Sequence, residues 1–167
     1  MWEFWWASGE ADGSDDPAGV ELGGGERLFL GEHRHGLDEK GRVIFPARMR
    51  DGLGGQVVLQ KGIDPCVYVF PPEEWERQVQ NVTQLPTTKP EARRYARFFF
   101  SQAQSERIDK QGRLTIPQSF RSYAGLQREV VIVGAGPRVE IWDAGRWESQ
   151  RAEAESNVEE FSSELGI

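Results

Sequence analysis

The chain has 167 residues, 38% hydrophobic and 28% charged, a composition typical of a folded globular protein. No apolar run reaches the roughly 18 residues that a membrane-spanning helix needs, and the apolar start of the chain lacks the basic flank of a signal peptide. The net charge of −7 argues against a polyanionic partner, but residues 28–142 hold 17 Lys and Arg against 13 Asp and Glu, so the middle of the chain is basic and a nucleic-acid partner is not excluded.

Residues 1–27 differ from the rest of the chain. They are rich in Gly and Asp, lack the periodicity of a helix or strand, and contain three of the six tryptophans. They fit either a disordered tail or an extension upstream of an incorrectly assigned start. We prefer the second interpretation, because residues 23–26 can be encoded by a purine-rich, ribosome-binding-like message just before Leu28. On this hypothesis Leu28 is the native first residue.

The first β-rich unit is expected at residues 32–74. A tight turn at 38–41 ends in a glycine, which supplies the positive φ that such turns often need, and begins with an aspartate that can bond its own backbone. Pro46 then opens a short helix, where its missing N–H is harmless. Strands are expected in the segment that ends at Leu37 and over 42–45, 56–60 and 66–70.

Linker helices are expected at residues 75–102, the first of them carrying Trp75 and opened by Pro72. The second falls within 90–104, where apolar residues follow the i, i+3, i+4, i+7 spacing of one helical face. The apolar positions are Ala92, Tyr95, Ala96 and Phe99. We interpret Arg93, Arg94 and Arg97, on the other side, as a solvated face rather than a second basic patch.

A second unit, expected at 103–146, repeats the first. Residues 37–50 (LDEKGRVIFPARMR) align with 108–121 (IDKQGRLTIPQSFR) at an offset of 71, with five identities in 14 positions. The match continues at an offset of 72 through a strand and a tryptophan, Trp147. This pattern indicates a duplication, and units of about 45 residues are too small to bury a stable core alone. The acidic residues 147–167 are expected to form a helix that either frays or packs on a neighbour.

The pattern with chemical meaning is Asp-x-x-x-Arg, which recurs in the turn of each unit. A two-stranded ribbon with a basic tip fits the major groove of DNA, where Arg can bind guanine and Lys can bind phosphate. An aspartate beside phosphate is repelled, so its expected role is to orient the Arg or cap the turn. We predict DNA-binding residues at Lys40, Arg42, Lys110 and Arg113, and turn-shaping or orienting residues at Asp38, Asp109, Gly41 and Gly112.

Each of these features also has a plainer interpretation. An isolated Asp-x-x-x-Arg fits a simple ion pair across a hairpin, and it is the recurrence of the whole block that favours a function. Arg50 and Arg121 end helices, where cations suit the helix dipole. His33 and His35 fit a solvated strand face better than a metal pair or a DNA contact. Cys66, the only cysteine, fits a reducing compartment and a buried position, so no disulfide, metal site or cofactor is expected.

The chain resembles the MraZ family over residues 28–167. The resemblance rests on 29–32 (FLGE), on the block at 37–50 with its Asp, Lys, Gly, Arg, Pro and final Arg, and on 139–142 (VEIW). It implies a β-rich α+β fold in which two tandem SpoVT-AbrB-type units form a double-split, swapped-hairpin β-barrel with peripheral helices. It also implies that Asp38, Arg42, Asp109 and Arg113 carry the family motif.

The resemblance further implies a cytoplasmic, nucleoid-associated transcriptional regulator. Such a protein forms ring-like homo-oligomers, octamer-like or dodecamer-like, and binds short repeats upstream of the division and cell-wall gene cluster. The alternative is an AbrB-type, antitoxin-like protein-interaction module without specific DNA recognition. Nothing resembles a nucleophile with its base, a P-loop or a Rossmann glycine run, so no enzyme is expected. The second turn departs from the pattern, with Gln111 at the position of Lys40, and residues 1–27 have no counterpart.

Overall fold

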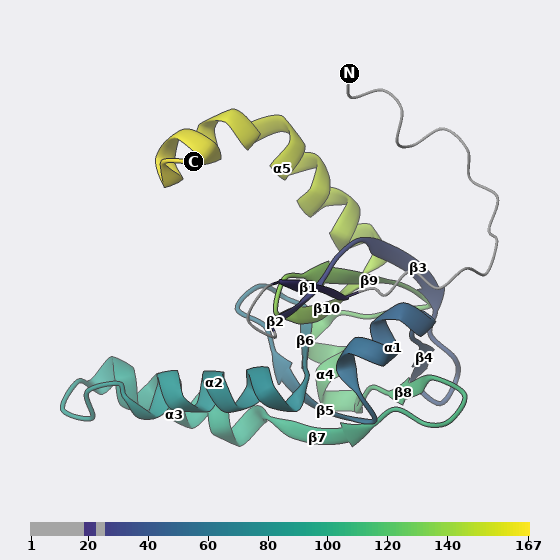
Figure 1. The fold of residues 1–167 in the computed structure, drawn as a ribbon, viewed down its shortest axis with the longest axis horizontal. Coiled ribbons are helices and arrows are strands. Elements are labelled where there is room, and N and C mark those ends of the chain that lie inside the picture. The colour runs from purple at the N-terminus through teal and green to yellow at the C-terminus, as the bar shows by residue number, and fades with distance from the viewer. Residues whose placement is uncertain (1–18, 23–25) are drawn as a thin grey trace.

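Figure 1 shows the fold as a computed structural model, which describes residues 19–22 and 26–167. The chain is a β-rich α+β protein with antiparallel sheets, the class predicted from the sequence. The strands are β1 (Gly19–Leu22), β2 (Glu26–Phe29), β3 (Glu32–Gly36), β4 (Arg42–Ile44), β5 (Gln56–Lys61), β6 (Val67–Phe70), β7 (Gln104–Arg107), β8 (Arg113–Thr115), β9 (Glu129–Ala135) and β10 (Arg138–Asp143). The helices are α1 (Ala47–Leu53), α2 (Pro72–Thr83), α3 (Pro90–Gln102), α4 (Gln118–Ala124) and α5 (Ala144–Leu165).

The two repeats share one six-stranded sheet, with the order β3-β9-β10-β6-β5-β7. The first strand of each repeat pairs with the third strand of the other, because β3 lies against β9 and β7 lies against β5. The fourth strands, β6 and β10, pair at the centre, and the second strands, β4 and β8, form a separate two-stranded ribbon. Each repeat therefore takes hydrogen-bond partners from the other, which gives a physical reason for the duplication.

The observed elements lie close to their predicted positions. Both short helices begin directly after a proline, Pro46 and Pro117, whose backbone is still extended. The helix expected within 90–104 ends at Gln102, because Gln104 already belongs to a strand paired with β5. Among the described strands no closed barrel is detected, since β3 and β7 are the edges of the six-stranded sheet. Barrel closure therefore stays a prediction.

The main hydrophobic core is built by equivalent residues of the two repeats. Alternate residues of the strands point into it, as the two-residue period of a strand requires, for example Val57 and Leu59 in β5 and Val130 and Ile132 in β9. Helices α1 and α4 add the equivalent side chains Met49 and Phe120, both fully buried. A smaller cluster lies on the other side of β9 and β10 and is covered by the start of α5.

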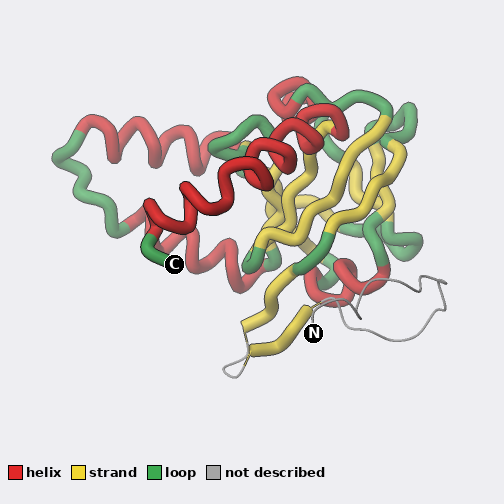
Figure 2. Tube along the Cα trace, turned by 90° about the horizontal axis from the view of Figure 1, so that it is seen from above, coloured by secondary structure: helices red, strands yellow, loops and turns green. Residues whose placement is uncertain are grey.

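Two helical projections leave the sheet and extend toward the same side, as Figures 1 and 2 show. One is the α2–α3 arm, a helical hairpin attached at its base where the rings of Trp75 and Phe99 stack with their centroids 4.8 Å apart. The other is α5, capped by Asp143 and attached to β3 where Trp147 Nε1 donates to Glu32 Oε2 at 2.8 Å. The described residues include no helix with the length and apolar character that crossing a membrane requires.

The first strands lie in the segment for which the sequence predicted a disordered or incorrectly assigned extension. Within it, β1 pairs with β2 in an antiparallel hairpin. Phe29, at the end of β2, is fully buried, and its backbone exchanges hydrogen bonds with Gly136 at 2.7 and 3.2 Å. The rest of the predicted extension, residues 1–18 and 23–25, lies outside the described residues, so the prediction for residues 1–27 stays a prediction.

Candidate nucleic-acid interface

The turn between β3 and β4 is organised by the carboxylate of Asp38. Its Oδ1 accepts the backbone N–H groups of Lys40 and Arg42, each at 2.9 Å, and its Oδ2 accepts the Nε–H of Arg42 at 2.7 Å. Gly41, with a φ of 74°, donates its N–H to the Asp38 carbonyl at 3.0 Å. Because this ion pair uses the Nε edge of the guanidinium, it fixes the direction of Arg42 without using the terminal amino groups.

The turn between β7 and β8 repeats this geometry. Asp109 Oδ1 accepts the backbone N–H groups of Gln111 and Arg113 at 2.9 Å, and its Oδ2 accepts the Nε–H of Arg113 at 2.7 Å. Gly112 has a φ of 79° and donates to the Asp109 carbonyl at 2.9 Å. The orienting role predicted for both aspartates therefore has a geometric basis, and both arginine side chains stay partly exposed, at 27% for Arg42 and 32% for Arg113.

The same hydrogen bonds lower the pKa of both aspartates. For Asp38 the largest cause is the bond from the backbone N–H of Arg42, and for Asp109 it is the bond from the backbone N–H of Arg113. A carboxylate with a lower pKa in the folded state stabilises the fold above its unfolded pKa, which is about 3.9. That contribution is lost as the pH falls through the folded-state pKa, because the proton then binds to both states.

We therefore expect the free energy of unfolding to decrease as the pH falls below about 4, in part through these two turns. The variant Asp38→Asn/Asp109→Asn should depend less steeply on pH in this range, which urea unfolding at a series of pH values would measure. The control is Glu39→Gln, which removes a carboxylate of the same turn that takes no part in this hydrogen-bond set. Equal acid slopes in the double variant and the wild type would contradict the expectation.

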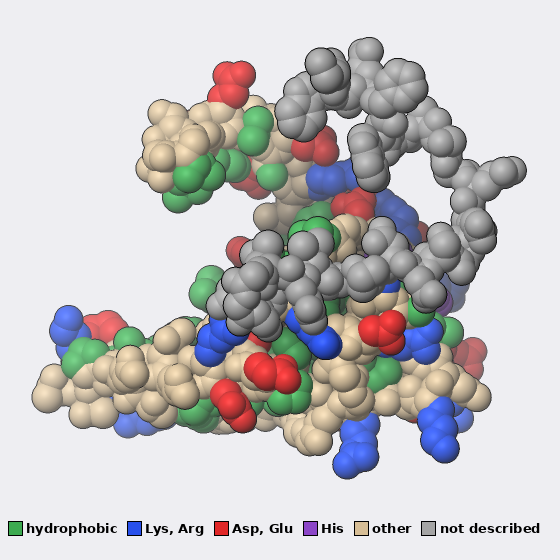
Figure 3. Space-filling model, viewed as in Figure 1, with side chains coloured by type: hydrophobic (Ala, Val, Ile, Leu, Met, Phe, Trp, Pro, Cys, Tyr) green, Lys and Arg blue, Asp and Glu red, His purple; other side chains and the backbone are tan. Residues whose placement is uncertain are grey.

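The β4–β8 ribbon places both arginines on one face. Arg42 is paired with Thr115 and Arg113 with Ile44, and alternate residues of a strand share a face, so all four side chains lie on the outer side. The two arginines lie diagonally on this face, with Ile44, which is 42% exposed, directly across from Arg113. The intervening residues are fully buried on the inner side: Val43 and Leu114. Figure 3 shows Lys and Arg side chains projecting from the end of the molecule where Figure 1 places this ribbon.

Each turn also rests against an arginine of the opposite repeat. A Cβ added at Gly41 would lie 2.8 Å from the guanidinium carbon of Arg121, and one added at Gly112 would lie 2.6 Å from Nη1 of Arg50. Arg121 is held in place by donating its Nε–H to the Ile116 carbonyl at 3.0 Å. The sequence interpretation placed both arginines at helix ends but missed these contacts. The sequence contained one signal for these contacts, because the turn glycine and the final arginine of the block both recur at the offset of 71.

The predicted lysines occupy different positions in the two turns. Lys40 and Lys110 are both exposed, but Lys40 directly precedes Gly41, whereas Lys110 lies one residue earlier in its turn. Gln111 takes the position equivalent to Lys40, and its backbone N–H makes the equivalent bond to Asp109. The two turns thus orient an arginine in the same way but differ in the side chain next to it.

The remaining candidates from the sequence take structural roles. His33 Nε2 lies 2.6 Å from Nη2 of Arg48, and burial followed by the charge of Arg48 lowers the pKa of His33. Cys66 is fully buried, and its burial is the main reason that its thiol pKa is raised. Within the described ranges no group of His, Cys, Asp and Glu side chains could hold a metal ion.

The fold and these turns define a tandem-repeat protein in which two β-rich units exchange strand partners and jointly present one exposed ribbon with two aspartate-oriented arginines. The chain matches the family described as "MraZ protein, putative antitoxin-like" twice in succession, over residues 28–98 and 99–165. It belongs to the MraZ family, and the two matches confirm the duplication predicted from the 71-residue offset.

Three similar proteins carry the name transcriptional regulator MraZ. Those of Natranaerobius thermophilus and Pelotomaculum thermopropionicum are each 46% identical to the chain over 138 residues, and that of Clavibacter michiganensis is 48% identical over 138 residues. Each alignment covers 83% of this chain and 95–96% of the relative. The family assignment made from the sequence is therefore confirmed.

Proposed function

We propose that this chain is a sequence-specific DNA-binding transcriptional regulator whose β4–β8 ribbon enters the major groove. The observation that carries the proposal is the pair of arginines, Arg42 and Arg113, held in fixed directions on one exposed face. The major groove admits a two-stranded ribbon, and an oriented guanidinium can donate two hydrogen bonds to O6 and N7 of guanine. Lys40, Lys110 and the turn N–H groups then suit the neighbouring phosphates.

The proposed targets are short repeated sites upstream of the division and cell-wall gene cluster, and the proposed location is the nucleoid in the cytoplasm. Support comes from the family and from relatives named transcriptional regulators. A ring-like homo-oligomer, octamer-like or dodecamer-like, would present several ribbons to several repeats, which raises avidity without new contacts. The exchanged pairing of β3 with β9 and β7 with β5 supports the further proposal that the units form a swapped-hairpin, double-split barrel.

The test is binding of the purified protein to its own upstream DNA and to a scrambled duplex of equal length, measured by fluorescence anisotropy across a salt series. The logarithm of the binding constant should fall linearly with the logarithm of the salt concentration, with a slope of about −0.9 per neutralised phosphate. The preference for the upstream DNA should persist as salt weakens both complexes. Equal affinity for the two duplexes at every salt concentration would contradict specific recognition.

A second candidate function is an antitoxin-like protein-interaction module, which the family description favours. This module would hold a protein partner and would not distinguish between DNA sequences. The two functions separate in the anisotropy experiment, because only the regulator shows a preference between the upstream and scrambled duplexes.

A further inference from the structure

The distal half of α5 carries an exposed apolar stripe. Val158, Phe161 and Leu165 follow the i, i+3, i+7 spacing of one helical face and are 60%, 40% and 72% exposed. Two acids with an i, i+4 spacing, Glu155 and Glu159, lie along one side of this stripe. Residues 152–165 contain five glutamates and no Lys or Arg, so this half of the helix is strongly acidic.

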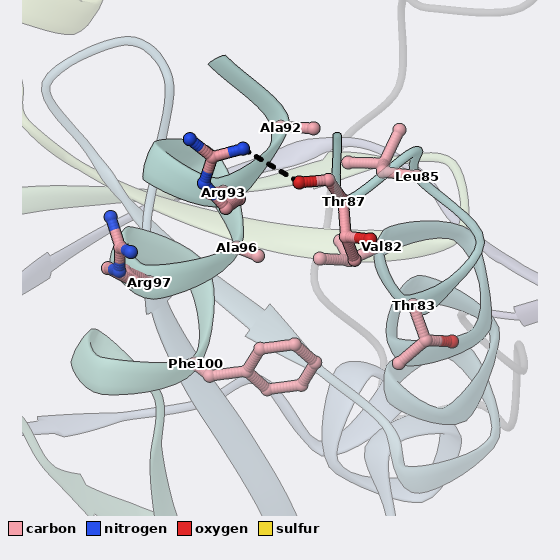
Figure 4. Close-up of a pocket in the computed structure, with 9 residues that line it drawn as sticks. All are labelled: Val82, Thr83, Leu85, Thr87, Ala92, Arg93, Ala96, Arg97 and Phe100. Carbon is pink, nitrogen blue, oxygen red and sulfur yellow. Dashed lines mark hydrogen bonds between the residues drawn. The ribbon is translucent and has the colours of Figure 1, made fainter. Parts of the chain in front are cut away.

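The α2–α3 arm contains a groove of the opposite character. A cavity of about 370 Å³ lies between the two helices. Ala92, Ala96 and Phe100 point across it toward α2, and Arg93 and Arg97 stand along its α3 edge, as Figure 4 shows. The floor is completed by Val82 and Leu85, the latter 37% exposed.

The arginines of α3 are all exposed, in agreement with the solvated face expected from the sequence. The structure adds that two of them, Arg93 and Arg97, line the same groove as Ala92 and Ala96. Arg93 also holds the loop between the helices, because its Nη1 donates to the carbonyls of Thr87 and Thr88 at 2.8 and 3.2 Å.

We propose that the distal half of α5 from one copy of this chain docks in the α2–α3 groove of a second copy. The apolar stripe would cover the groove floor, with Phe161 as the central side chain, in the helix-in-groove mode. The i, i+4 spacing of Glu155 and Glu159 matches that of Arg93 and Arg97, so both pairs span about 6 Å of helix and can face each other. Packing of one α5 against another would instead bring two acidic helices together, which is unfavourable.

The partner is a second copy rather than the same chain, because Figure 3 shows open space between α5 and the arm within one molecule. In such a contact two different surfaces of identical chains meet, and repeating it produces a closed ring or an open filament. The inference rests on the self-association included in the proposed function, and it names the surfaces that carry it. Self-association through these two surfaces does not require DNA, so it is measured on the protein alone.

The first test compares two matched pairs of variants by sedimentation velocity over a range of protein concentrations. Phe161→Asp places a charge in the stripe, and its control Ser163→Asp adds the same charge off the stripe. Arg97→Glu reverses the charge at the groove edge, and its control Arg94→Glu does so at a position outside the groove lining. Phe161→Asp and Arg97→Glu should sediment as single chains at concentrations where the wild type and both controls are multimeric.

The second test uses rescue. Arg97→Glu combined with Glu159→Arg in one chain should restore the multimer, because each contact then regains a pair of opposite charges. Mixing Phe161→Asp protein with Arg97→Glu protein should give a dimer of one copy of each. The Arg97→Glu chain supplies the one intact stripe, and the Phe161→Asp chain supplies the one intact groove. Circular dichroism confirms that each variant is folded.

A wild-type protein that is monomeric at all concentrations would overturn the proposal. So would multimers of the folded Phe161→Asp and Arg97→Glu variants as large as those of the wild type. A failure of the mixed variants to form the dimer would also overturn it, since the contact would then not join a stripe to a groove.

Discussion

Replacing Arg42 and Arg113 together by alanine should remove the preference for the upstream DNA and leave the protein folded. An arginine that binds guanine through two hydrogen bonds contributes about 1–3 kcal/mol of discrimination. Each single variant should therefore lose about 5- to 150-fold in affinity for the specific site, and much less for the scrambled duplex. Both side chains lie on the outer face of the ribbon, so their removal leaves the core unchanged. The measurement is anisotropy on both duplexes at a fixed salt concentration.

Two further variants distinguish recognition of the DNA sequence from the general attraction of a positive charge to DNA. Arg42→Lys keeps the positive charge but loses the planar fork, so it should keep the salt dependence and lose most of the preference. Arg94→Ala removes a positive charge from the α2–α3 arm, which Figure 1 shows at the opposite end of the molecule from the ribbon, and should leave the preference unchanged. If the double alanine variant is folded and still prefers the upstream DNA, the ribbon is not the surface that recognises the sequence.

The local chemistry of the turns could be predicted from the sequence because it depends on neighbours in the chain. Asp38 reaches Lys40 and Arg42 within four residues, and the requirement for positive φ at Gly41 arises inside the same turn. Because the whole block of residues 37–50 recurs at 108–121, a coincidental Asp–Arg ion pair is an implausible explanation of the pattern. The predicted orienting role of the aspartates follows from these short-range contacts.

The contacts between repeats could not be predicted in the same way. Pairing of β3 with β9 joins residues almost one hundred positions apart, and the pattern of apolar residues in a strand does not name its partner. The contact of Arg50 with Gly112 also joins the two repeats. It forms only when β4 of the first repeat and β8 of the second lie side by side. The groove between α2 and α3 could not be predicted for a related reason, since it depends on how the two helices pack against each other.

Gly112→Ala should destabilise the protein more than Gly136→Ala, although both glycines have a positive φ, 79° and 73°. The backbone strain for a non-glycine residue, about 1–2 kcal/mol, is common to both variants. The difference comes from space, because a Cβ at Gly112 would meet three atoms of Arg50 within 2.8 Å, whereas a Cβ at Gly136 would meet nothing within 4 Å. Urea unfolding of the two variants would measure the difference directly.

Arg50 cannot move away from that Cβ without cost. Its Nε is buried and has no hydrogen-bond partner among the described residues. Its Cδ, 2.7 Å from the added Cβ, lies closer to the backbone than the mobile end of the side chain does. The double variant Gly112→Ala/Arg50→Ala should therefore lose less stability than the sum of the single variants, a coupling that a double-mutant cycle isolates. Gly112→Ala should also weaken binding to the upstream DNA, because the turn that carries Arg113 shifts with Arg50, and Gly136→Ala should not. A coupling near zero with unchanged DNA binding would show that Asp109 alone holds Arg113 in its direction and that Arg50 makes room for the added Cβ without loss of stability.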